Sequence, residues 1–131
     1  MIELVFGGIA YGATLIGCYD GDTCKFRIDG APALVDTVHV RLAGMDTPEI
    51  RGKCQEEKDL ALVARDYTLD YLRNFNGYGI VHDLRDKYGR MVVEFPDLVS
   101  GLISNDLARP YDGKTKRQGW CGKDLDNEAS I

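Results

Sequence analysis

The chain has 131 residues, of which 44% are hydrophobic and 28% charged, and its formal net charge is -5. A chain of this size and composition is expected to form one domain with one core, and its apolar content excludes a disordered chain. The excess of acidic over basic residues argues against broad electrostatic capture of nucleic acid. No apolar run approaches the ~20 residues of a transmembrane helix, so no membrane association is expected.

The N-terminal stretch MIELVFGGIAYGATLIGC is apolar and ends in a cysteine, much as a lipoprotein signal does. A secretory signal begins with a basic segment, whereas the only early charge here is Glu3. We therefore expect a structural strand rather than a signal peptide. The localisation stays unknown, and a secreted or periplasmic protein remains open if an upstream signal was removed.

Alternating polarity and turn residues predict five short strands. The first hairpin turn is YDGD and the last is DKYG. The predicted strands are Ile9–Cys18, Thr23–Asp29, Val35–Ala43, Tyr78–Asp86 and Arg90–Phe95.

Two helices are predicted between and after these strands. From Gln55 to Phe75 the apolar period changes to three and four residues, and a shorter helix begins at Pro96. The apolar face of the first helix is expected to consist of Leu60, Val63, Ala64, Tyr67 and Tyr71.

The order of elements favours an α+β fold, mainly β, built on a five-stranded barrel of the oligonucleotide/oligosaccharide-binding (OB) kind. One helix is inserted after strand 3 and a second follows strand 5. We expect a single domain over residues 1–131, with its core at about 9–111 and an irregular tail at 112–131.

The four cysteines are not arranged as a zinc site, because no C-x-x-C pair exists and the two histidines are far apart. Cys54 and Cys121 lie in polar, glycine-bearing segments and are the favoured disulfide pair, while free thiols remain an equal alternative. The sequence leaves Cys18 and Cys24 undecided.

Acidic side chains cluster at two predicted loops. Asp20 and Asp22 lie on the first hairpin turn, and Asp46 and Glu49 follow the third strand. Hard cations prefer several oxygen ligands, so Asp22 and Asp46 could hold one ion if both loops meet at one end of the barrel. Either cluster alone is better explained as turn chemistry, because Asp-Gly and Asp-Thr-Pro are good turn formers.

Two arginines make the cation interpretation stronger. Arg41 lies near the end of the third strand and Arg90 follows the DKYG turn. A guanidinium binds phosphate bidentately and stays charged, although a lone surface arginine more commonly forms an ion pair. Two arginines and three carboxylates, each at a turn or strand end, are a more demanding coincidence than either cluster alone, and Arg41 is placed where a guanidinium could reach a phosphate held by the cation.

The motifs DGDT, VRLAGMDTPE, DKYGR and LISNDLARPY, in this order, resemble the signatures of the staphylococcal nuclease family. The resemblance covers roughly Ala13 to Tyr111. It implies an OB-fold barrel with helices and Ca²⁺-dependent hydrolysis of DNA and RNA. Members of this family cleave the bond to the 5′ oxygen and leave 3′-phosphate ends.

The resemblance also implies roles for the acidic residues, position by position. Asp22 and Asp46 would bind Ca²⁺ together with the carbonyl of Thr47, and Asp20 would support the site from behind. Glu49 would orient or deprotonate the attacking water.

The remaining roles concern the substrate. Arg41 and Arg90 would hold the scissile phosphate and stabilise charge in the transition state. Lys87 and Tyr88 would contact a terminal phosphate, and Tyr111 would lie near the bound nucleotide. The expected substrates are DNA and RNA, preferably single-stranded, and the expected oligomeric state is a monomer.

The chain departs from the family pattern at two places. The stretch IRGKCQEEKDL after Glu49 is shorter than the family's mobile loop, and no second substrate-contacting tyrosine follows Tyr111. Lys114, Lys116 and Arg117 either grip the nucleic-acid backbone or form a solvated basic loop. A non-catalytic OB-fold module that only binds nucleic acid, and an acidic scaffold domain, are the alternatives to an enzyme.

Overall fold

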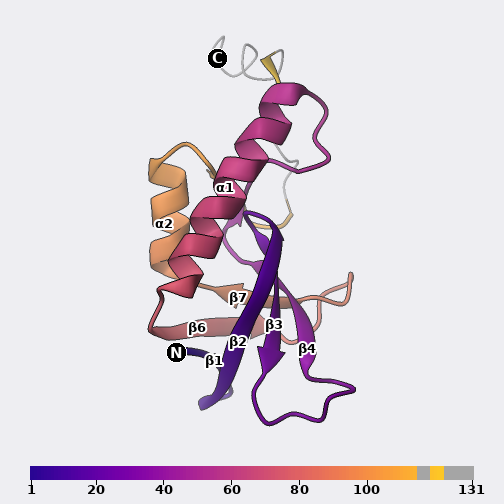
Figure 1. Ribbon diagram of the computed structural model, residues 1–131, viewed down its shortest axis with the longest axis vertical. Coiled ribbons are helices and arrows are strands. Elements are labelled where there is room, and N and C mark those ends of the chain that lie inside the picture. Colours follow the sequence, from indigo (N-terminus) through magenta and orange to yellow (C-terminus); the bar gives the residue numbers. More distant parts are fainter. Residues whose placement is uncertain (115–118, 123–131) are drawn as a thin grey trace.

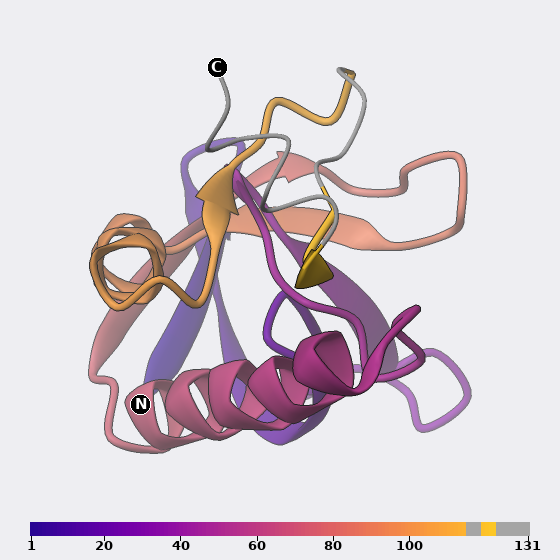
Figure 2. The ribbon, with the colours of Figure 1, turned by 90° about the horizontal axis from the view of Figure 1, so that it is seen from above.

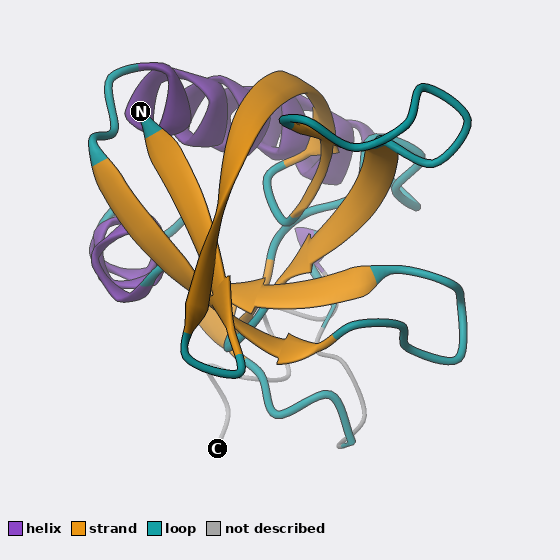
Figure 3. Ribbon diagram, turned by 90° about the horizontal axis from the view of Figure 1, so that it is seen from below, coloured by secondary structure: helices purple, strands orange, loops and turns teal. Residues whose placement is uncertain are grey.

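The computed structural model describes residues 1–114 and 119–122, and its centre is a closed barrel with the strand order β1-β2-β3-β4-β7-β6 (Figures 1 and 3). Neighbouring strands run antiparallel, except that β1 pairs with β6, and β4 with β7, in parallel. The barrel strands are β1 (Ile2–Phe6), β2 (Ile9–Asp20), β3 (Thr23–Ile28), β4 (Thr37–Leu42), β6 (Gly77–Asp83) and β7 (Met91–Glu94).

The barrel has six strands, so the prediction of five is wrong. The N-terminal segment forms a hairpin of its own, because Gly7 and Gly8 both adopt positive φ angles, of 60° and 78°, and reverse the chain between β1 and β2. The added strand β1 then pairs with β6 and closes the barrel.

Two helices and a small two-stranded sheet complete the described chain. They are α1 (Gln55–Arg73), α2 (Pro96–Ser104), β5 (Met45–Asp46) and β8 (Arg109–Pro110). The third and fifth predicted strands correspond to β4 and β7. α2 directly follows β7, whereas the two-residue strand β5 lies between β4 and α1. The antiparallel pairing of β8 with β5 adds regular structure at the end of the expected core, just before the tail at 112–131. Neither of these helices is both long and apolar enough to cross a membrane.

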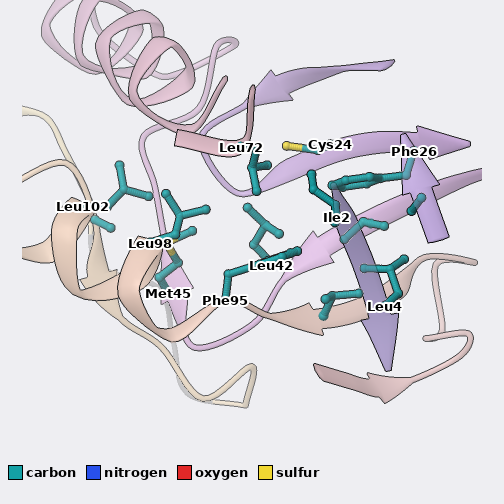
Figure 4. Packing of buried hydrophobic residues seen from close by; sticks show 14 of the residues in the cluster. Ile2, Leu4, Cys24, Phe26, Leu42, Met45, Leu72, Phe95, Leu98 and Leu102 are labelled. Carbon is teal, nitrogen blue, oxygen red and sulfur yellow. The ribbon is translucent and has the colours of Figure 1, made fainter. Parts of the chain in front are cut away.

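The core runs without a break from the barrel interior to α2 (Figure 4). Phe26, Leu42 and Phe95 fill the barrel side, and Leu98 and Leu102 extend the same cluster from α2. Each of these side chains is fully or almost fully buried. Their burial explains why large apolar residues occupy these positions of the sequence.

The buried face of α1 is shifted slightly from the predicted one: Leu60, Tyr67 and Tyr71 pack against the core but are only partly buried. Val63 is 54% exposed, while the buried face consists of small or polar residues and one leucine. This face packs closely on the β2–β3 turn: a Cβ atom added at Gly21 would lie 2.9 Å from the Cβ of Ala64. The Thr68 hydroxyl donates a hydrogen bond of 2.7 Å to the Gly21 carbonyl. The buried residues of α1 are Glu57, Ala61, Ala64, Thr68 and Leu72.

All four cysteines form disulfides. Cys54 is joined to Cys121, as favoured from the sequence, and Cys18 is joined to Cys24 across the β2–β3 ladder. The first bridge links the start of α1 to the segment after β8, across a sequence separation of 67. It therefore ties the loop before α1 to the C-terminal part of the described chain.

Candidate active site

A cleft of about 910 Å³ opens between the β2–β3 turn, the end of β4, the β6–β7 hairpin and the segment after β8. Figure 2 shows the β6–β7 hairpin (salmon) and the segment after β8 (orange) on the same side of the barrel. The sequence-predicted site residues that line this cleft are Asp20, Asp22, Arg41, Glu49, Lys87, Tyr88, Arg90 and Tyr111. The structure thus brings together side chains that are up to about ninety positions apart in the sequence.

Asp22 connects three segments at the base of the cleft. Its side chain accepts hydrogen bonds from the Thr23 hydroxyl at 3.0 Å and from the Thr47 backbone N–H at 3.0 Å. The guanidinium of Arg41 lies 3.2 Å from the same carboxylate. Asp22 is only 5% exposed, so these contacts balance a charge that burial would otherwise make costly.

Asp20 has a different balance, because no basic side chain of the described residues forms an ion pair with it. Burial, and after it the negative charge of Asp22 and a hydrogen bond with the Asp22 side chain, raise the pKa of Asp20 to about 8. At neutral pH the Asp20 carboxyl is therefore mainly protonated. Two carboxyl groups this close favour sharing a proton or binding a cation.

Asp46 and Thr47 lie beside Asp22 but do not line the cleft. Both are buried, at 3% and 0% exposed, and the Thr47 hydroxyl oxygen has no hydrogen-bond partner in the described part of the chain. Carboxylate, carbonyl and hydroxyl oxygens are the ligands that Ca²⁺ prefers, so the donor set at this point suits a hard cation.

A second cluster of potential metal ligands, at the start of α1, cannot bind a metal ion through its cysteines. Within residues 1–114 and 119–122, Cys54, Glu56 and Cys121 are the only group of three or more His, Cys, Asp or Glu side chains whose ligand atoms all lie within 4.8 Å of one another. The disulfide occupies both sulfur atoms. A cation held by Asp22 and Asp46 would consequently depend on backbone oxygens and water for most of its ligands.

Arg41 is fixed at the end of β4 by three acceptors. Besides the Asp22 carboxylate, its guanidinium donates to the carbonyls of Leu42 at 2.8 Å and Met45 at 2.9 Å. A guanidinium has about five N–H donors. The donors that these contacts leave can bind an anion in the cleft without any loss of orientation.

Arg90 is held by Asp86, a residue that the sequence did not single out. The Asp86 carboxylate accepts hydrogen bonds from the backbone N–H groups of Tyr88 and Arg90, both at 2.8 Å, and from the Arg90 guanidinium at 3.1 Å. Burial acts in the opposite direction, yet these hydrogen bonds and the positive charge of Arg90 lower the pKa of Asp86. Arg90 and Lys87 both lie over the ring of Tyr88, at 5.1 and 5.2 Å from its centroid.

Glu49 lines the cleft from the loop before α1, and Glu57 holds this loop. The buried Glu57 carboxylate accepts a hydrogen bond of 3.1 Å from the backbone N–H of Glu49 and another of 3.1 Å from that of Lys53. A Cβ atom at Gly52 would lie 2.5 Å from the Glu57 side chain, so any larger residue there would displace the Glu57 carboxylate. Apolar periodicity cannot reveal a buried carboxylate, and Glu57 was missed for that reason.

The candidates after β8 divide into three cases. Tyr111 lines the cleft, and its N–H donates to the Gly44 carbonyl at 3.1 Å. Lys114 is exposed and follows Gly113, the last residue that lines the cleft, while Lys116 and Arg117 lie outside the described residues. Trp120 is 5% exposed and the centroid of its ring lies 4.0 Å from the Arg109 guanidinium, so it packs against the fold.

The fold and the cleft together define a small closed β-barrel with a cleft in which arginines lie beside buried carboxylates. No protein-family model matches the chain. The chain is similar to a protein of Penicillium rubens named "Probable endonuclease lcl3", with 31% identity over 91 residues. This similarity covers 60% of the chain and 31% of the relative, so the chain spans about a third of the length of that protein.

Proposed function

We propose that this protein is a Ca²⁺-dependent nuclease that hydrolyses phosphodiester bonds of DNA and RNA at the 5′ P–O bond and leaves 3′-phosphate ends. The observation that carries the proposal is the meeting of Asp22, Arg41, Glu49 and Arg90 in one cleft. The similarity to a relative named as an endonuclease supports it, although the chain spans only part of that relative.

The charges of the cleft favour a cation as part of the site. Its lining has six acidic residues against four basic ones, so without a counter-ion it would repel a phosphodiester. Asp22, Asp46 and the Thr47 carbonyl would hold Ca²⁺, with Asp20 behind them. When bound, the ion would neutralise charge on the phosphate oxygens.

The side chains of this protein would divide the reaction among them. Arg41 and Arg90, each fixed by a carboxylate, would bind the non-bridging phosphate oxygens and stabilise the extra charge of the transition state. Glu49 would orient a water molecule opposite the leaving 5′ oxygen and accept its proton. Lys87, Tyr88 and Tyr111 would then position the nucleotide.

Digestion of single-stranded DNA and RNA with and without Ca²⁺ tests the proposal. We expect cleavage in Ca²⁺, none in EGTA, and products that become extendable by a polymerase only after removal of a 3′ phosphate. Glu49→Gln should lower kcat by more than about a hundredfold, and Glu56→Gln, an exposed carboxylate nearby, should not.

The outcome that rejects the proposal is protein that binds Ca²⁺ and leaves both substrates intact. In that case, salt-sensitive binding of the same oligonucleotides would favour the non-catalytic OB-fold module, and no binding at all would favour the scaffold domain.

A further inference from the structure

A second hollow, of about 340 Å³, adjoins the cleft on the surface of β2, β3 and β4. These three strands lie next to one another in the barrel (Figure 1). Tyr19 and Thr23 line both the hollow and the cleft, so the hollow continues the cleft along the strands. The residues that line the hollow are Ile16, Gly17, Cys18, Tyr19, Thr23, Cys24, Lys25 and His39.

Two irregularities in the β2–β3 ladder turn apolar side chains toward this hollow. Ile16 and Tyr19 are skipped in the β2–β3 register, and each is the extra residue of a β-bulge. They are 45% and 53% exposed, although the residues around them in β2 are mostly covered. Bulges re-aim side chains and are frequent beside active sites. The strand thus presents the ring of Tyr19 at the edge of the cleft. This ring is not part of the hydrophobic core.

The next positions on these strands supply positive charge at a suitable spacing. Lys25 pairs with His39 across β3 and β4, and both are exposed, while Thr23 pairs with Arg41 at the cleft. Lys25 and Arg41 are diagonal neighbours on these two strands, and such neighbours lie about 7–8 Å apart. Neighbouring phosphates of an extended single strand have a similar separation, so Lys25 and Arg41 are spaced to contact two successive phosphates.

The local charge of the hollow also differs from that of the whole protein. The chain carries a formal net charge of -5, yet none of the described residues that line the hollow is acidic. An exposed aromatic ring beside a lysine, without nearby carboxylates in the lining, is the combination with which proteins bind single-stranded nucleic acid. A basic surface of a protein partner would have no carboxylate to pair with in this lining.

We propose that this hollow is a nucleotide subsite for single-stranded nucleic acid. An unpaired base stacks on the ring of Tyr19, with Ile16 covering its edge, and the phosphate next to the scissile one contacts Lys25. The inference rests on the proposed function, because it continues the strand whose scissile phosphate lies at Arg41. Stacking on one aromatic ring strengthens binding by about tenfold to a hundredfold.

The first test compares kcat/KM for a single-stranded oligonucleotide with kcat/KM for a phosphodiester of one nucleoside, which has no second base to stack on Tyr19 and no second phosphate for Lys25. We expect Tyr19→Ala to lower the ratio of the two values by tenfold or more, and Tyr19→Phe to keep it, since stacking needs only the ring. Lys25→Ala should lower the ratio and its dependence on salt. Tyr11→Ala is the control, because Tyr11 lies on the same strand and is 44% exposed. This substitution should leave the ratio unchanged.

The second test measures binding without cleavage, on a Glu49→Gln background. A series of oligonucleotides carries 2-aminopurine at a different position in each. Only the oligonucleotide whose 2-aminopurine occupies the subsite should lose fluorescence on binding, and Tyr19→Ala should remove this quenching. If the wild-type protein cleaves but neither the ratio nor the quenching depends on Tyr19, the subsite is wrong and the nuclease proposal stands. If the protein does not cleave but the quenching depends on Tyr19, the subsite stands and the nuclease proposal fails. A dimer that Tyr19→Ala dissociates would overturn the subsite in favour of self-association.

Discussion

Replacing Glu57 by glutamine tests how the loop that carries Glu49 is held. The Glu57 carboxylate is 6% exposed and accepts backbone hydrogen bonds from Glu49 and Lys53. Hydrogen bonds to a charged group contribute about 1.5–3 kcal/mol each. Glutamine keeps one acceptor oxygen but turns an NH₂ group toward the other N–H, so we expect a loss of about 2–4 kcal/mol of unfolding free energy.

Glu56→Gln is the matched control, because it removes the same charge from the same first turn of α1 at an exposed position. Loss of the favourable interaction with the helix N-terminus, about 0.3–1 kcal/mol, is common to both variants. The difference between their urea unfolding curves therefore isolates the two hydrogen bonds.

The same variants test whether this loop positions Glu49 for reaction. A misplacement of about 1 Å can cost roughly a hundredfold in rate, so Glu57→Gln should lower kcat at least tenfold under conditions in which it is folded. Gly52→Ala should act in the same direction, because a Cβ atom would displace the Glu57 side chain. Equal stability of Glu57→Gln and Glu56→Gln would show that the two hydrogen bonds to Glu57 do not stabilise the fold. An unchanged kcat of Glu57→Gln would show that Glu57 does not position Glu49.

Two further predictions concern the remaining buried carboxylates. Because the folded-state pKa of Asp20 is raised from 3.8 to about 8, the contribution of Asp20 to the stability of the cation-free protein should be largest below pH ~4 and fall as the pH rises toward 8. Asp20→Asn should remove this loss and raise the unfolding free energy at pH 8 in EGTA, by urea titration, with the exposed Asp66→Asn as control; no gain at pH 8 would contradict it. Asp86 has a lowered pKa, so its contribution should be present above pH ~4 and lost as the pH falls below that value. Asp86→Asn should lower the free energy of unfolding by about 1–2 kcal/mol at pH 7 and raise KM for a phosphodiester. Asp83→Asn is the control, because Asp83 accepts one backbone hydrogen bond on the same hairpin, and it should change both quantities less.

The alternation of polar and apolar residues was sufficient to locate the main strands. β3 and β4 lie within the predicted ranges because one face of each meets the core and the other meets solvent. The extra strand β1 could also have been found. Two glycines between apolar runs are a signal of a tight hairpin, and Gly7 and Gly8 form that turn.

Other features could not be read from periodicity, because they depend on how close two elements approach. Gly21 does not have a positive φ angle, so tight bending does not explain it. It is glycine because α1 and Thr47 leave no space for a Cβ atom. The same proximity places Ala64 and Thr68, rather than Val63, on the buried face of α1.

The residues that sequence reasoning missed at the cleft have a common physical property: their main partners are backbone N–H groups. Glu57 binds two of these groups beside Glu49, and Asp86 binds two beside Arg90. Any residue type supplies a backbone N–H, so the partner leaves no mark in the sequence. A motif such as DKYGR thus identifies the arginine that faces the cleft, whereas the carboxylate that orients it is recognised only when the turn is seen folded.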